Sequence, residues 1–172
     1  MDHRWRKRSA WKGIVAGLAG GLAGAYVMNQ FQKGWSTAQH KLSGSGHARS
    51  TDEPDATMLT ANKVARPFLH RELTREEQKK ASPIVHYAFA AAVGTGYGAA
   101  AEYKPFVRKF AGVPFGAALF AGADELAVPV FKLSKHPKEY PLSSHLYGFA
   151  SHVVYGATIE AVRRGVRAAL GS

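Results

Sequence analysis

The chain has 172 residues and a mass of 18.5 kDa, a length that favours a single domain. It contains no cysteine, which excludes disulfide bonds and thiolate metal sites. The formal net charge is +11, but the basic residues gather at the ends of uncharged stretches instead of forming one stripe, so we expect no nucleic-acid partner.

Charge is distributed very unevenly along the chain, which has 23 basic and 12 acidic residues. Four windows contain no charged residue except the adjacent pair Asp124 and Glu125. Each window is about as long as the roughly 20 residues that a helix needs to cross the hydrocarbon layer, so we predict four transmembrane helices. A soluble bundle is the alternative, but a soluble helix normally shows a charged face, and three of the windows show none. The windows are Gly13–Gln32, Pro83–Ala101, Phe110–Phe131 and Tyr140–Ile159.

The first half of the chain is expected to hold one span and a long loop. Residues 1–12 form a basic tail and residues 13–32 form span one, because a signal peptide would have a shorter apolar run of about 7–15 residues. Residues 33–82 are expected to form an extracytoplasmic loop with short helices, which includes a flexible Ser/Gly linker at residues 43–47.

Local signals mark two helices in the second part of this loop. A short helix is expected within residues 52–70 and should stop at Pro67, which disrupts a helix interior. Thr74 and Glu77 have the spacing of a capping box, and they predict the start of a helix that runs into span two. Pro83 then either interrupts this helix or lies in its first transmembrane turn.

Residues 83–172 are expected to form a three-span core, with spans at 83–103, 110–131 and 140–162 and a basic C-terminal tail. With four spans, three basic clusters would lie on one side of the membrane, and their charge would place that side and both chain termini in the cytoplasm. The clusters are Arg4, Arg6, Lys7, Arg8 and Lys12; Lys104, Arg108 and Lys109; and Arg163, Arg164 and Arg167.

Small residues recur at every fourth position on three of the spans, which places them on one helix face. Such rows let helix backbones approach closely in lipid. The row on span four also contains His152 and continues to Glu160, so packing faces and polar faces coincide. The glycines expected at helix contacts are Gly13, Gly17, Gly21, Gly94, Gly98, Gly148 and Gly156.

Asp124 and Glu125 stand side by side in the middle of span three. A carboxylate at the centre of a bilayer is costly unless it is paired, so we expect these acids to face the bundle interior. His152 on span four lies at a similar depth and is the expected partner of one acid, because adjacent helical residues point about 100° apart. The candidate functional cluster is therefore Asp124, Glu125 and His152.

Other polar residues of the spans are expected to support this cluster. Thr95 and Tyr97 have hydroxyl groups that we expect to donate hydrogen bonds to the same acid. Tyr155 is a further supporting residue, on the same span as the histidine of the cluster. His86 and His145 are expected near the outer membrane edge, where a polar tip reaches water easily.

Two further acids are expected at the inner ends of the spans, in structural roles. Glu160 should pair with Arg163 and Arg164, three and four residues further along a helix. Glu102 is expected to lie near Lys104.

Several stretches from Leu73 to Arg164 point to one family. They are LTREEQKKASPIVHYAF, GTGYGAAAE, PFGAALFAGADELAVP and LSKHPKEYPLSSHLYGFASHVVYGATIEAVRR. In these stretches the chain resembles the YagU-like bacterial inner-membrane proteins, a family of unknown function. Its motifs correspond here to His86–Phe89, Ala123–Glu125 and Ser151–Gly156. The resemblance implies a helical, multi-pass protein of the bacterial inner membrane, and it implies no reaction, cofactor or catalytic residue.

We therefore interpret the sequence as an all-α, integral membrane four-helix bundle with a partly helical 50-residue loop between spans one and two. The cluster is expected to handle protons or cations, or to serve small-solute transport, because histidine and a desolvated carboxylate both titrate near physiological pH. The alternative is a non-catalytic membrane scaffold or interaction subunit, in which the polar cluster only clamps the helices.

We expect no enzymatic activity, because the sequence offers no nucleophile or metal that would complete a membrane enzyme. No cofactor or metal ion is expected, since the spacing of His145 and His152 is not that of a recognised metal site. The expected partners are the lipid bilayer and either a second copy of the chain or another membrane protein.

Overall fold

The computed structural model describes residues 8–43 and 55–171, and every regular element in these ranges is a helix. The expected linker after Ser43 and the basic residues Arg4, Arg6 and Lys7 lie outside the described residues. Two elements, η1 and η3, are 3-10 helices, and η2 is a π-helix. The order is α1 (Ala10–Ser43), α2 (Ala56–Leu69), α3 (Arg75–Tyr103), η1 (Pro105–Gly112), α4 (Val113–Leu119), η2 (Phe120–Ala127), α5 (Val128–Val130), η3 (Pro137–Glu139) and α6 (Leu142–Ala169).

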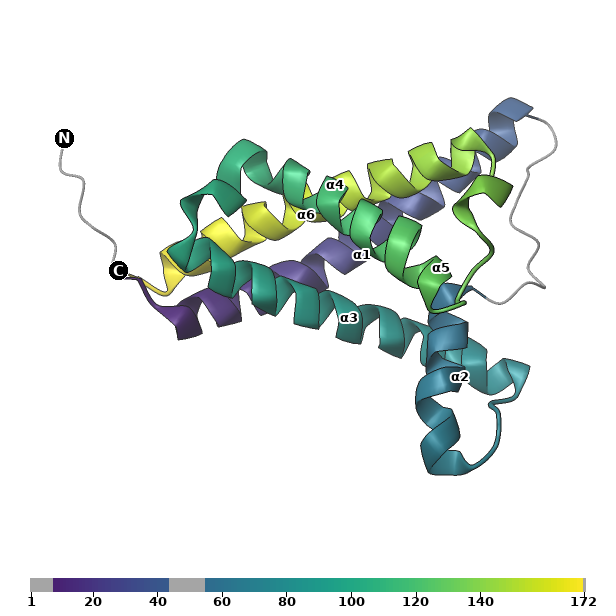
Figure 1. Ribbon diagram of the computed structural model, residues 1–172. Coiled ribbons are helices and arrows are strands. Elements are labelled where there is room, and N and C mark those ends of the chain that lie inside the picture. The colour runs from purple at the N-terminus through teal and green to yellow at the C-terminus, as the bar shows by residue number, and fades with distance from the viewer. Residues whose placement is uncertain (1–7, 44–54, 172) are drawn as a thin grey trace.

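Four long helical segments alternate in direction along one bundle (Figure 1). They are α1, α3, the segment from η1 to α5, which we call the third segment, and α6. Helix α1 packs against both α3 and α6, α4 packs against α6, and α2 packs against α3 where it projects from the bundle. The start of α1 and the end of α6 lie at the same end of the bundle, where Lys12 Nζ donates a hydrogen bond of 3.2 Å to the carbonyl of Gly171.

Glycines bring the backbones of α1 and α3 into contact. A Cβ atom added to Gly17 would stand 2.7 Å from the Cα of Gly98, and one added to Gly94 would stand 2.7 Å from the Cα of Gly21. Gly13 lies in the same row and faces the side chain of Glu102. These distances are too short for any side chain. The glycines at every fourth position therefore form the surface along which α1 and α3 pack.

A neighbouring face of α1 meets α6 in a similar way. Gly20 lies against the backbone of Ile159, and Gly24 lies against the ring of Tyr155. Glycines on two neighbouring faces of α1 therefore let this helix lie between two others, at the centre of the bundle.

Helix α6 also uses small residues to hold the third segment. A Cβ atom on Gly156 would stand 2.8 Å from the backbone nitrogen of Gly116 in α4. Nearer the start of α6, Gly148 lies against the ring of Phe120. The third segment thus packs along one row of α6, and it also contacts α3, where the rings of Phe115 and Tyr97 lie 4.4 Å apart.

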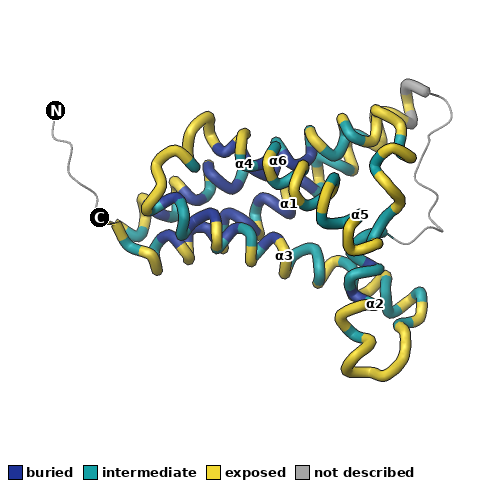
Figure 2. The backbone as a smooth tube through the Cα atoms, viewed as in Figure 1, coloured by how far each residue is buried: buried dark blue, intermediate teal, exposed yellow. Residues whose placement is uncertain are grey.

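The interior contains few large apolar side chains and several charged ones. Burial is concentrated along α1, α6 and the second half of α3 (Figure 2). The buried hydrophobic cluster contains Ala25, Met28, Ala90, Tyr97, Ala101, Tyr155 and Ile159. The buried polar and charged residues are Ser151, His152, Glu160, Arg163 and Arg167.

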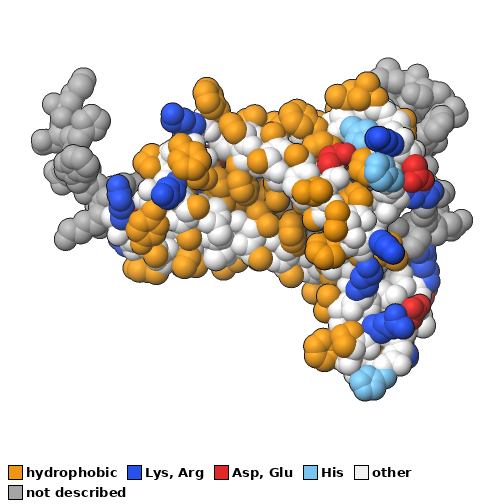
Figure 3. All heavy atoms as spheres, in the orientation of Figure 1, with side chains coloured by type: hydrophobic (Ala, Val, Ile, Leu, Met, Phe, Trp, Pro, Cys, Tyr) orange, Lys and Arg blue, Asp and Glu red, His pale blue; other side chains and the backbone are white. Residues whose placement is uncertain are grey.

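Many large apolar side chains lie on the outside of the bundle. Ile84 on α3 is 70% exposed, Leu142 on α6 is 72% exposed, and α1 exposes a series of residues that includes Leu18 and Leu22. On the face drawn in Figure 3, charged side chains gather toward the two ends, and hydrophobic and uncharged groups cover the middle. Exposed large apolar side chains and buried charged ones therefore occur together in this bundle.

Two described segments are long and apolar enough to cross a membrane. They are Ala10–Gln39, with a mean hydropathy of 1.2, and Pro105–Val130, with a mean hydropathy of 1.3. Helices α3 and α6 have 29 and 28 residues and exceed the length of a span. Their composition does not reach the same hydropathy. The fold is therefore shown to be all-helical, but composition does not establish four membrane spans.

Several element boundaries differ from the expected ones. Helix α1 continues to Ser43 and takes in the first part of the expected loop. Pro67 does not stop α2, which runs to Leu69, because a proline in the last turn interrupts little of the helix, and His70 then caps it in a left-handed conformation. The capping box of Thr74 and Glu77 is confirmed, and α3 continues through Pro83.

The third segment is not the single α-helix that was expected. It begins at Pro105, and its backbone turns sharply at Phe110, Ala111 and Gly112, where φ is 51°, 53° and 80°. Gly112 touches α6 at this turn, since a Cβ atom on it would stand 3.0 Å from the Cβ of Glu160. The segment is therefore a series of short helical pieces.

Candidate functional site

Asp124 and Glu125 lie in η2, the π-helical part of the third segment. A π-helix is wider than an α-helix and rare, and short π segments occur frequently at functional sites. The sequence gives no direct signal for it, because the expected periodicity for these residues was that of an ordinary helix. The unusual backbone coincides with the two acids that charge alone had singled out.

Asp124 lies beside His152 of α6, with 3.7 Å between Oδ2 and Nδ1. The same Nδ1 atom is 2.9 Å from the carbonyl oxygen of Gly148, which fixes it as a donor. The ring of His152 is also held by Phe120, whose centroid is 5.7 Å away. The imidazole is thus buried and oriented, and its contact with the carboxylate is electrostatic.

Glu125 makes a second and shorter contact to α6. Its Oε1 atom is 2.7 Å from Nδ1 of His145, and Nε2 of the same ring is 3.0 Å from the carbonyl oxygen of Pro137. His145 was expected near the outer membrane edge with a tip that reaches water; its side chain is 25% exposed, and it also bridges the third segment and the loop before α6. The two acids therefore contact different histidines. We call Asp124, Glu125, His145 and His152 the acid–histidine cluster.

The two acids were expected to face the bundle interior, but the structure does not place them there. The side chain of Asp124 is 45% exposed, and Glu125 is half-buried. Because the third segment begins at Pro105, the acids lie toward its end at Val130 and not at its middle. The acids are partly exposed because α6 covers only one side of η2.

His86 of α3 lies within electrostatic range of Asp124 and His152. Its Nε2 atom is buried without a hydrogen-bond partner among the described residues. Within residues 8–43 and 55–171, no group of three or more His, Asp or Glu side chains is placed to hold a metal ion. The imidazole adds a third titratable ring near the cluster.

Glu160 is the most deeply buried acid of the described chain, with 1% of its side chain exposed. Its carboxylate accepts bonds of 2.6 and 2.9 Å from Arg163 and one of 2.6 Å from Arg164, which confirms the expected pairs. Tyr97 donates its hydroxyl to the same carboxylate over 2.9 Å. Tyr97 therefore serves Glu160 and not the acids of the third segment, which corrects the expected assignment.

Thr95 and Tyr155 were both expected to support the cluster. Thr95 is half-buried, and it points to nearly the opposite side of α3 from Tyr97, because it lies two residues before it in the helix. Tyr155 is buried and donates its hydroxyl to the carbonyl oxygen of Ala90 over 3.1 Å. It joins α6 to α3 within the core.

Glu102 pairs with Arg167, and not with the nearby Lys104. The distance from Arg167 Nε to Glu102 Oε1 is 2.8 Å, and the backbone N–H of Ser9 donates to the same carboxylate over 3.3 Å. This acid thus ties the start of α1, the end of α3 and the end of α6 together. Lys104, two residues further on, points to a different side.

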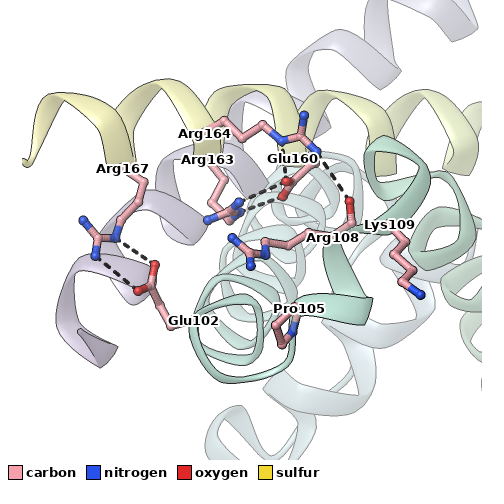
Figure 4. A pocket seen from close by; sticks show the side chains of 8 residues that line it. All are labelled: Glu102, Pro105, Arg108, Lys109, Glu160, Arg163, Arg164 and Arg167. Carbon is pink, nitrogen blue, oxygen red and sulfur yellow. Dashed lines mark hydrogen bonds and ion pairs between the residues drawn. The ribbon is translucent and has the colours of Figure 1, made fainter. Parts of the chain in front are cut away.

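These ion pairs border a pocket with a volume of about 390 Å³ at the end of the bundle that holds the chain ends (Figure 4). We call it the basic pocket. Residues from α3, η1 and α6 line it: Glu102, Pro105, Arg108, Lys109, Glu160, Arg163, Arg164 and Arg167. The sequence had predicted that the second and third basic clusters share one side, and the pocket shows that they meet.

A family model described as protein of unknown function (DUF1440) matches residues 37–161, which is most of the chain. The chain belongs to the DUF1440 family. The match extends from the second half of α1 to α6 and includes both the acid–histidine cluster and Glu160. No curated protein and no solved structure matches the chain.

Proposed function

We propose that this DUF1440 protein is a four-span integral membrane protein whose acid–histidine cluster binds and releases protons. The finer placement, in a bacterial inner membrane with both termini in the cytoplasm, rests on the resemblance to YagU-like proteins and on the three basic clusters that an order of four spans puts on one side. The proposal assigns no enzymatic reaction, cofactor or metal ion to the chain.

The membrane part of the proposal rests on the reversed distribution of side chains. Large apolar residues are exposed on all four long segments, whereas Glu160, Arg163 and Arg167 are buried. In water this arrangement would expose apolar surface and desolvate charge at the same time. In lipid the exposed groups are well solvated, and buried charges survive by pairing with one another.

The modest hydropathy of α3 and α6 is compatible with this environment. Several of their polar residues, among them Tyr97, Ser151 and Tyr155, are buried between helices. Ser151 donates to the carbonyl oxygen of Tyr147, so its hydroxyl is also satisfied within α6. A hydropathy average counts such groups as if they faced lipid, and it underestimates helices that enter a bilayer as part of a bundle.

The proton part rests on the contacts of Glu125 with His145 and of Asp124 with His152. Each pair joins a carboxylate to an imidazole, the side chain whose charge changes between about pH 5 and 8. The side chains of Asp124 and Glu125 are 45% and 31% exposed, so neither acid is sealed inside the packed core of the bundle. Protonation of a histidine strengthens its contact with the acid, and deprotonation weakens it.

The test uses purified protein in sealed vesicles that enclose a pH-sensitive dye. After a pH jump outside, the native protein should move protons faster than protein-free vesicles do. The double variant Asp124→Asn with Glu125→Gln keeps shape and loses both charges, and we expect it to fall to the protein-free rate. Glu76→Gln, which removes an exposed acid at the start of α3, is the matched control and should retain the native rate.

One observation favours a scaffold as the second candidate. His145 bonds Glu125 and the carbonyl of Pro137, and the ring of His152 lies against that of Phe120 with 5.7 Å between the centroids, so both rings also hold the third segment in place. If the double variant has the native proton rate but a lower unfolding temperature, the cluster is a clamp and the proton proposal is wrong.

A further inference from the structure

The basic pocket has more positive charge than its own acids neutralise. Five basic and two acidic side chains line it, an excess of three positive charges. The two acids are fully engaged, since Glu160 binds Arg163 and Arg164 while Glu102 binds Arg167.

Arg108 and Lys109 are the basic residues that remain. Both are exposed, and neither has an ion-pair partner among the described residues. Figure 4 shows Arg108 extending toward Glu160 and Arg163 across the pocket, with Lys109 at its edge. Two cations thus flank a cavity whose other cations are held in place by buried acids.

The backbone holds these two residues in position. Lys109 leaves the helical region with φ −61° and ψ 150°, and Phe110, Ala111 and Gly112 follow with positive φ. Gly112 is pressed against Gly156 and Glu160 of α6, and Arg164 Nη2 donates to the carbonyl of Arg108 over 3.4 Å. The turn is therefore fixed to α6 before any ligand arrives, which lowers the entropic cost of binding.

Exposed aromatic side chains surround the two cations. Phe106 and Phe110 come from the same turn, and Phe110 is 79% exposed. Tyr103 at the end of α3 and Trp11 at the start of α1 are exposed at the same end of the bundle. Aromatic rings together with Lys and Arg are typical of the level at which lipid headgroups meet water.

We propose that the basic pocket binds the phosphate group of an anionic phospholipid, with Arg108 and Lys109 as its principal contacts. This proposal rests on the membrane part of the proposed function and is independent of the proton part. The charge excess selects an anion, and the aromatic surroundings place that anion at the headgroup level, where basic pockets between helices bind such lipids. A volume of about 390 Å³ is large enough for a phosphate and its glycerol.

The test measures the unfolding temperature of the full chain in a neutral detergent while a short-chain phosphatidylglycerol is added. A ligand that binds the folded state raises this temperature in a saturable manner. Arg108→Gln with Lys109→Gln should weaken the apparent affinity by about thirty-fold, because each basic residue near an anionic lipid contributes roughly five-fold. Lys79→Gln with Lys80→Gln, two exposed lysines of α3, is the matched control and should leave the affinity unchanged.

Two further ligands identify the source of the phosphate. Short-chain phosphatidylcholine should give no saturable shift, and inorganic phosphate should give none at the concentrations at which phosphatidylglycerol saturates. An equal shift with inorganic phosphate, or an equal affinity in the Arg108 and Lys109 variant, would overturn the proposal. Asp124 and Glu125 are intact in both variants. A negative result with the lipids therefore does not contradict the proton proposal, and a negative result in the vesicle assay does not contradict the lipid proposal.

Discussion

Tyr97 and Glu160 lie 63 positions apart in the sequence, and their side chains meet at 2.9 Å inside the bundle. The hydroxyl of Tyr97 completes a set of donors around a carboxylate that Arg163 and Arg164 also bind. One buried acid therefore links α3 to α6 and holds two arginines at the border of the basic pocket.

Replacement of Glu160 with Gln should destabilise the protein strongly. It leaves the buried guanidinium of Arg163 without its counter-charge, and breaking a buried pair in this way costs about 3–5 kcal/mol. Tyr97→Phe removes one hydrogen bond to a charged group and should cost about 1.5–3 kcal/mol. Unfolding temperatures in detergent should therefore fall in the order native, Tyr97→Phe, Glu160→Gln. Equal stability of the native protein and Glu160→Gln would show that the carboxylate does not hold the bundle together.

Glycine-to-alanine replacements should have opposite effects at neighbouring positions of α3. A Cβ atom on Gly98 would stand 2.6 Å from the Cα of Gly17, whereas one on Gly96 would meet nothing within 4 Å. We expect Gly98→Ala to cost about 1–3 kcal/mol through overpacking. Gly96→Ala should be neutral, or stabilising by up to about 1 kcal/mol, because alanine favours the helix. Unfolding temperatures in detergent test both, and an equal loss at the two positions would contradict the contact between α1 and α3.

The start of α3 should respond to acid through Glu77, which lies outside the proposed spans. The Arg71 guanidinium donates bonds of 2.7 and 2.8 Å to this carboxylate and lowers its pKa to about 2. Because the folded pKa is depressed, the stabilising contribution is present above the ordinary value of 4.5 and is lost as the pH falls through about 2.

In Arg71→Ala the titration midpoint of Glu77, followed by NMR of its carboxyl carbon, should rise toward 4.5. It should stay somewhat below that value, since the backbone N–H of Thr74 still binds the carboxylate. Lys80→Ala, at an exposed lysine, serves as the control and should not move the midpoint. A midpoint that is unchanged without Arg71 would contradict the assignment.

Local signals in the sequence were sufficient for features that depend on neighbouring residues. The capping box at Thr74 and the pairing of Glu160 with Arg163 are confirmed because each joins residues three or four positions apart. The glycine spacing on α1 likewise places these residues on one face, whichever helix it meets.

The expected proximity of His152 to one of the two acids is observed at Asp124, 3.7 Å away, but most features that depend on distant parts of the chain could not be predicted. Glu102 pairs with Arg167, 65 positions away, and Tyr97 meets Glu160, so sequence distance gave no indication of either contact. The π-helical backbone around Asp124 has no known spacing signal, and it turns the two acids toward different histidines. Placing the acids in the interior failed because η2 packs against α6 on one side, which leaves the side chain of Asp124 45% exposed.

The claim that the four segments cross a membrane is tested most directly by side-specific labelling. The chain has no cysteine, so single cysteines at Lys109, Lys80 and Lys138 can be labelled without background by a thiol reagent that does not cross membranes. In sealed vesicles of one orientation, Lys109→Cys should react from one side only, and Lys80→Cys and Lys138→Cys from the other side only. Reaction of all three from the same side would contradict the four-span account, as would release of the protein into water by alkaline carbonate.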